Sequence, residues 1–77
     1  MTKSEFIEVL EQVWELDPGT IRGDEVIDDV GTWESIAVVE FIALIDENAG
    51  ITLQPEKIAE AKTIQDLMNL LGDNIIP

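Results

Sequence analysis

The chain has 77 residues, so we expect one small domain that spans residues 1–77. Its 17 acidic and 4 basic side chains give a net charge of −13, which disfavours nucleic acids and anionic membrane surfaces as partners. The lack of cysteine and histidine excludes disulfides, thiolate zinc sites and the commonest catalytic bases. Because no apolar run is long enough to span a membrane, we expect a cytoplasmic protein, and we expect it to be a monomer.

Residues 4–16 have the pattern of an amphipathic helix. Apolar residues recur three and four positions apart from Phe6 to Leu16, with glutamates between them. Either Ser4 or Thr2 can accept hydrogen bonds from the first free N–H groups. The sequence DPG at residues 17–19 predicts the end of this helix, because proline lacks a donor and glycine permits a turn.

Residues 17–34 form a long connection that contains three glycines. A connection of this length in a small domain must be anchored or disordered, so we expect its isolated apolar residues to contact the core. These residues are Ile21, Val26, Ile27 and Val30. Four of the acidic residues in this segment offer oxygen ligands, but they lack the spacing and the central glycine of a calcium loop. We therefore expect no metal site in this segment. We interpret these four residues as part of a solvated acidic loop, and they are Asp24, Glu25, Asp28 and Asp29.

Three more helical segments follow this loop. A second helix is predicted over residues 35–49, closed by Gly50 in the left-handed conformation. A brief helical turn is expected at residues 56–61, and a last helix at residues 63–71, where Thr63 and Asp66 can form a capping box before Gly72 ends the helix. No strand-like alternation of useful length is present. The sequence therefore predicts an all-α fold, a small three- to four-helix bundle with a long first loop.

The second predicted helix has more apolar residues than one core stripe needs. Helical spacing places Val38, Phe41, Ile42 and Ile45 on one face, which we expect to lie in the core. A different face mixes apolar and acidic side chains and begins beside Ser35. This second face consists of Ile36, Glu40, Ala43 and Glu47. Either the whole helix is unusually buried, or this face docks a partner.

The segment TWESIAVVEFIALIDENAGITL, residues 32–53, is similar to the region around the modified serine of acyl carrier proteins and peptidyl carrier proteins. In that family an Asp-Ser-Leu triplet opens the second helix, and the triplet here is Glu34-Ser35-Ile36. The preceding tryptophan resembles the Trp-Asp-Ser-Leu variant of many free-standing carriers. Helix lengths, the long first loop and the acidity also agree, so the resemblance extends over nearly the whole chain.

The resemblance implies a non-catalytic carrier with an acyl-carrier-protein-like bundle. In the family, a phosphopantetheinyl transferase attaches 4′-phosphopantetheine from coenzyme A to the serine hydroxyl through a phosphodiester. Ser35 is the matching residue here. The terminal thiol of the arm holds an acyl or aminoacyl group as a thioester, so the implied partners also include an acyl- or aminoacyl-loading enzyme and a downstream synthase or transferase.

By the same resemblance, the docking surface for these enzymes would consist of Glu34, Ile36, Glu40, Ala43 and Glu47, together with parts of the acidic first loop. Ala37 occupies a position where many fatty-acid carriers have another acid. We therefore expect a dedicated secondary-metabolite, polyketide or modified fatty-acid pathway rather than bulk fatty-acid synthesis. The cargo itself is chosen by partner enzymes and leaves no trace in this sequence.

Two other functions remain open from the residues alone. A serine before an apolar helix is usually an N-cap, a role that is compatible with modification. If Ser35 is never modified, the protein would be an acidic interaction or adaptor module. An enzyme that uses Glu34 and Glu40 as an acid–base pair is disfavoured, because nothing in the sequence indicates a cleft around them.

Overall fold

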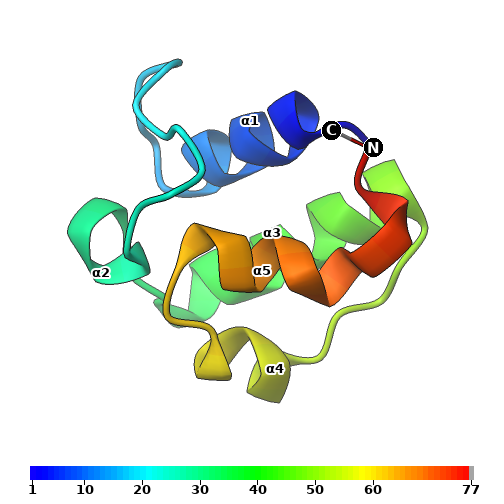
Figure 1. The fold of residues 1–77 in the computed structure, drawn as a ribbon. Coiled ribbons are helices and arrows are strands. Elements are labelled where there is room, and N and C mark those ends of the chain that lie inside the picture. The colour runs from blue at the N-terminus through cyan, green and yellow to red at the C-terminus, as the bar shows by residue number, and fades with distance from the viewer. Residues whose placement is uncertain (77) are drawn as a thin grey trace.

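The computed structural model describes residues 1–76 and confirms the all-α fold class (Figure 1). In this part of the chain the only β-type pairings are two isolated bridges, Thr2 with Ile76 and Val26 with Thr63. The α-helices are α1 (Lys3–Val13), α2 (Ile27–Val30), α3 (Ser35–Ala49), α4 (Pro55–Glu60) and α5 (Ile64–Leu71), and a 3-10 helix (Gly72–Asn74) follows α5.

Capping boxes begin both α1 and α5. At α1, the Glu5 N–H donates to Thr2 Oγ1 at 3.1 Å, and the Thr2 N–H donates back to Glu5 Oε1 at 2.8 Å. Thr2 is therefore the cap of α1, and not Ser4. Thr63 and Asp66 form the same reciprocal pair at α5, as the sequence predicts.

The end of α1 differs from the prediction, because the helix stops at Val13 and not near Leu16. The Leu16 N–H donates to the Glu11 carbonyl at 2.7 Å, and the Glu15 N–H donates to the Gln12 carbonyl at 3.2 Å. These two bonds form a Schellman motif around Glu15, whose φ of 55° is left-handed. The helix therefore ends before the DPG sequence begins, at a position where glycine is the usual residue.

Residues 17–26 lead from α1 to α2, a single helical turn that the sequence analysis missed. Ile21 and Ile27 are buried as predicted, and Val30 is half-buried. The prediction for Val26 is wrong, because its side chain is 47% exposed. Its backbone makes the contact instead, through the bridge to Thr63.

Two carboxylates hold this loop by accepting backbone hydrogen bonds. Glu11 is 5% exposed and accepts from the Ile21 N–H at 3.1 Å through Oε2. Glu25 accepts from the N–H groups of Arg22 and Gly23 at 2.7 and 2.8 Å. Burial acts to raise the pKa of Glu25, but these backbone hydrogen bonds outweigh it and lower the pKa below its ordinary value.

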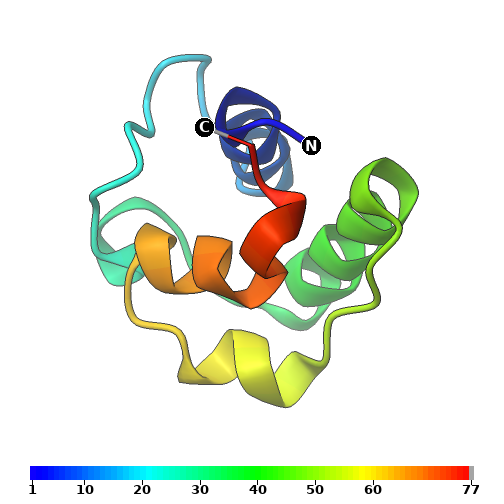
Figure 2. The same cartoon turned by 45° about the vertical axis from the view of Figure 1, so that its right-hand side comes forward.

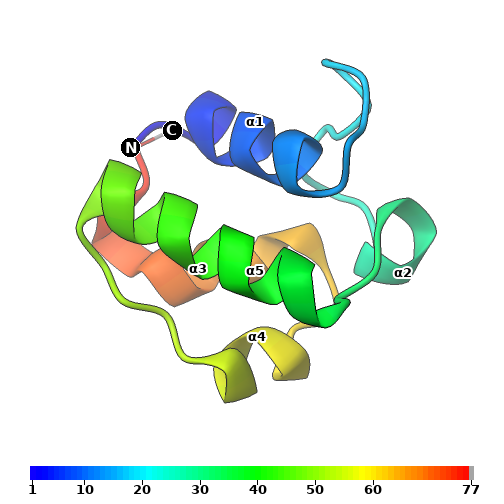
Figure 3. The same ribbon diagram turned by 180° about the vertical axis from the view of Figure 1, so that it is seen from behind.

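The core lies between α1, α3 and α5, and α4 covers its remaining side (Figure 2). Phe6 of α1 meets Phe41 of α3 edge to face, with ring centroids 5.9 Å apart. From α5, Ile64, Leu67, Met68 and Leu71 are buried against these helices. Seen from behind, α3 begins beside α2 and runs toward the two chain ends (Figure 3).

Candidate functional site

Ser35 is the first residue of α3, and its side chain is exposed. The N-cap position belongs to Glu34, which is extended with φ −75° and ψ 158°, and the first helical bond runs from the Val38 N–H to the Glu34 carbonyl at 3.1 Å. The interpretation of Ser35 as an ordinary N-cap is therefore wrong. Ser35 comes one residue after the N-cap, so its hydroxyl is not at the capping position.

No side chain caps the N-terminus of α3, in contrast to the capping boxes of α1 and α5. The N–H groups at the start of a helix point outward with the positive end of the helix dipole and attract anions. The first turn of α3 also contains no acidic residue, although Glu34 directly precedes it. An oxyanion on the Ser35 hydroxyl would therefore find free N–H donors beside it.

The segment that leads into Ser35 lies against Trp14, at the end of α1. The indole Nε1–H donates to the Thr32 carbonyl at 2.8 Å. Trp14 also packs on Trp33 at 5.0 Å between ring centroids, and Trp33 packs on Phe41 at 5.3 Å. The Trp33 Nε1 atom is buried and has no hydrogen-bond partner among residues 1–76. Both tryptophans thus pack against neighbouring aromatic rings.

α3 is not buried on all sides. Phe41 and Ile45 lie in the core as predicted, together with Ala37, whereas Val38 and Ile42 are half-buried at the edge of the core. The core stripe is thus rotated toward Ala37 relative to the prediction. The rotation exposes the opposite face, so the interpretation of α3 as simply the most buried helix is wrong.

The face that starts beside Ser35 combines apolar and acidic side chains. Ile36 is 76% exposed, Ala43 and Glu47 are exposed, and Glu40 is half-buried. The sequence analysis missed Val39, which is 66% exposed and lies one helical turn from Ile36. Its position in the sequence, three residues after an expected surface isoleucine, is the signal that could have identified it.

A hollow of about 230 Å³ lies next to Ser35, between the end of α1 and the start of α3. Its lining combines apolar walls with polar groups and consists of Val13, Trp14, Glu15, Thr32, Glu34, Ile36 and Ala37. Glu34 and Ile36 flank the serine in sequence, so the hollow and the hydroxyl belong to one region of the surface.

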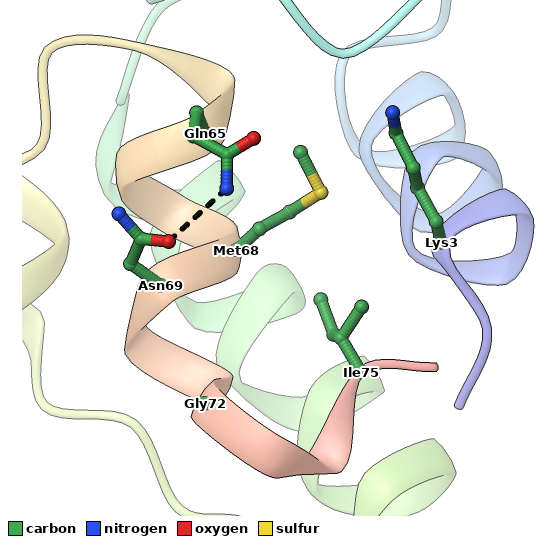
Figure 4. Close-up of a pocket in the computed structure, with 6 residues that line it drawn as sticks. All are labelled: Lys3, Gln65, Met68, Asn69, Gly72 and Ile75. Carbon is green, nitrogen blue, oxygen red and sulfur yellow. Dashed lines mark hydrogen bonds between the residues drawn. The ribbon is translucent and has the colours of Figure 1, made fainter. Parts of the chain in front are cut away.

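A second hollow of about 250 Å³ lies between α1, α5 and the 3-10 helix (Figure 4). Met68 and Ile75 point into it, and at its edge Gln65 Nε2 donates to Asn69 Oδ1 at 3.1 Å. None of the residues around Ser35 lines this hollow, so it is separate from the candidate site.

The acidic side chains do not form a metal centre in the described part of the chain, because no three of them are placed to hold one ion. Within the same residues, no helix has both the length and the apolar character needed to cross a membrane.

Comparison with known families identifies the family of the chain. A family model described as the phosphopantetheine attachment site matches residues 4–71, which include α2 to α5 and all of α1 except its first residue. The chain belongs to the phosphopantetheine-attachment family. A comparison with curated proteins finds no significant match.

Membership identifies the chain as a carrier domain of the acyl and peptidyl carrier type and not as an enzyme. Members of the phosphopantetheine-attachment family carry 4′-phosphopantetheine covalently. The residues around Ser35 fit such a group, because the hydroxyl is exposed and the helix start beside it is uncapped.

Proposed function

We propose that Ser35 is the attachment site of the 4′-phosphopantetheine arm and that the protein delivers an acyl or aminoacyl cargo to partner enzymes. The observation that carries this proposal is the exposed Ser35 hydroxyl on the first residue of α3, a helix that no side chain caps. The chain contains only one other serine, Ser4, which lies within α1.

The start of α3 would hold the phosphodiester of the arm. The N–H groups of Ile36 and Ala37 and the positive end of the helix dipole favour a negative group on the Ser35 oxygen. Glu34 opposes this effect with its charge and keeps the neighbouring surface acidic. The arm supplies a terminal thiol for thioester chemistry, which the chain cannot provide because it has no cysteine.

The docking surface in this proposal is the exposed face of α3. Ile36 and Val39 offer a small apolar contact beside Ser35, and Glu40 and Glu47 add negative charge along the same helix. α3 contains no basic residue, so its charge favours partner enzymes with basic patches, a phosphopantetheinyl transferase among them. Such contacts speed association and leave the affinity weak enough for release.

The pathway in this proposal is a dedicated one and not bulk fatty-acid synthesis. Ala37 is a buried residue in the first turn of α3. This turn therefore lacks the additional acidic group that many fatty-acid carriers have at the matching position. A transferase or synthase that depends on that charge would dock here less well.

Mass spectrometry of the intact protein tests the attachment site. Incubation with coenzyme A and a broad-specificity phosphopantetheinyl transferase should add about 340 Da to the wild type. The Ser35→Ala variant should gain nothing, and the Ser4→Ala control should gain as much as the wild type. If the wild type gains no mass with several active transferases, the unmodified interaction module is the better description of this acidic protein.

A further inference from the structure

Trp14 makes two contacts with the backbone that precedes Ser35. Its Nε1–H donates to the Thr32 carbonyl at 2.8 Å, and its ring lies close to Gly31. A Cβ atom added at Gly31 would come within 2.2 Å of Trp14 Cδ2. The indole therefore leaves no space for any side chain at position 31.

The backbone of Gly31 does not itself require glycine. Its φ of −161° is an extended conformation that every residue adopts. The other four glycines have positive φ values, and those at positions 19, 50 and 72 have no atom within 4 Å of an added Cβ. The contact with the Trp14 ring is thus the feature that explains a glycine at position 31.

These contacts connect the end of α1 to the start of α3. Gly31 and Thr32 lie four and three positions before Ser35, and the Trp33 ring adds a tilted contact with the same indole, with ring centroids 5.0 Å apart. Trp14 is fixed in turn by the Schellman motif, because it lies between the helix and Glu15. A residue at the end of α1 therefore contacts each of the three residues from Gly31 to Trp33 that lead toward α3.

We propose that Trp14 is a positioning residue for the chemistry at Ser35: through Gly31 and Thr32 it fixes where the first turn of α3 presents the hydroxyl. The proposal rests on the proposed function, since it concerns the transfer of the arm to Ser35. The hydrogen-bond partner of the Trp14 ring is Thr32 and not Ser35. Trp14 acts by holding the acceptor oxygen in one geometry while a transferase is docked on α3.

Transfer rates respond steeply to misplacement of a reacting atom, whereas docking through the exposed face of α3 does not depend on the Trp14 contact. Loss of the contact should therefore lower kcat more than it raises KM for the carrier. Changes at the docking face, such as Ile36→Ala, should instead act mainly through KM.

The test compares modification kinetics of Gly31→Ala, Trp14→Ala and the double variant, each measured below its thermal midpoint and corrected for the folded fraction by circular dichroism. Each single variant should lose kcat by roughly tenfold, with KM changed by about twofold or less. The double variant should be no slower than Trp14→Ala alone, because the added methyl group no longer meets an indole. Trp14→Phe, which keeps a ring against Gly31 but not the hydrogen bond, should lose kcat by only about threefold.

Gly50→Ala is the matched control. It introduces the same side chain at a φ of 70° with no neighbouring atom, at the opposite end of α3. It should lower the thermal midpoint through backbone strain and leave kcat at the wild-type value. Hydrogen exchange gives a readout without any transferase, since the amides of residues 32–36 should exchange faster in Gly31→Ala and not in Gly50→Ala.

A wild-type kcat in Gly31→Ala would overturn the positioning role, and so would losses that add in the double variant. An equal loss of kcat in Gly50→Ala would show that stability, and not position, sets the rate. A wild type that gains no mass overturns the proposed function and this proposal together. If the wild type is modified normally and Gly31→Ala has the wild-type kcat, only the role of Trp14 is overturned.

Discussion

Glu25 shows how one carboxylate can hold a loop in a chain with so much negative charge. The N–H groups of Arg22 and Gly23 donate to its two oxygens, so the ionised form is the one that the folded state needs. The neighbouring backbone bridge of Val26 with Thr63 then connects the end of this loop to α5. A small domain with a long first connection gains order from such local contacts.

The lowered pKa of Glu25 predicts a pH-dependent contribution to stability. Because the pKa is lower in the folded state, this contribution is present above the ordinary value of 4.5 and is lost as the pH falls through the folded pKa. Glu25→Gln should lower the free energy of unfolding at pH 7 by about 1 kcal/mol, and the difference from wild type should shrink below pH 4.5. Urea unfolding of both proteins at pH 7 and at pH 3 measures this difference in the free energy of unfolding.

Glu8→Gln is the control, since it removes the same charge from an exposed position on α1. Its effect at pH 7 should stay within about 0.5 kcal/mol. A constant difference between wild type and Glu25→Gln at both pH values would contradict the role of the ionised carboxylate.

Sequence reasoning predicted Ser35 as the first residue of its helix, as in α3, but the alternative of a simple N-cap is wrong. A serine before an apolar run is typically an N-cap, and only the backbone angles of Glu34 show that the cap lies one residue earlier. Val39 was missed for a related reason, since periodicity alone does not fix the rotation of a helix whose residues are almost all apolar. The contact between Trp14 and Gly31 joins residues 17 positions apart and has no local signal.

At the scale of elements, the bounds of the helices that the sequence predicts lie within one residue of the observed bounds, except at the end of α1. Thr63 and Asp66 are three residues apart, which is the spacing of a capping box, and α5 begins directly after Thr63. The end of α1 depends on Glu15 taking a left-handed conformation, for which glutamate has no preference. α2 has only four residues, too few for a periodic pattern, so it could not be distinguished from a loop.

The conformation of Glu15 predicts an unusual stabilising substitution. Its φ of 55° is unfavourable for any residue with a Cβ, and glycine is the common choice at this position of a Schellman motif. Glu15→Gly should therefore raise the free energy of unfolding by about 0.5–1 kcal/mol. The same substitution at Glu8, inside α1, should lower it by about 1 kcal/mol.

Chemical denaturation of both variants decides this prediction, because each loses one carboxylate and each gains a glycine. A gain of stability in both variants would show that charge, and not backbone conformation, dominates at Glu15. A loss at Glu15 alone would show that its side chain makes a contribution larger than the strain.

At the scale of the whole molecule, charge is the dominant feature. A net charge of −13 on 77 residues gives a field that attracts basic partners and also strains the folded state through self-repulsion. The same composition predicted the class of partner from sequence alone, because net charge does not depend on the fold. The fold decides only that α3 presents acidic and apolar side chains together, without a basic residue.

Self-repulsion predicts a salt-dependent thermal midpoint. Screening is weak at about 10 mM salt and strong at about 150 mM, where the Debye length is near 8 Å. The thermal midpoint at neutral pH should therefore rise by several degrees between these conditions, as followed by circular dichroism. If the midpoint stayed constant or fell, repulsion among the acidic side chains would not limit the stability of the fold.

The central claim is that Ser35 carries the arm in the living cell. Protein isolated from its native source and cleaved into peptides allows a direct measurement of the peptide that contains Ser35. Our account predicts that this peptide is heavier by about 340 Da, or by that amount plus an acyl or aminoacyl cargo, with fragment ions that locate the group on Ser35. A fully recovered peptide of unmodified mass, or the same group located on Ser4, would contradict it.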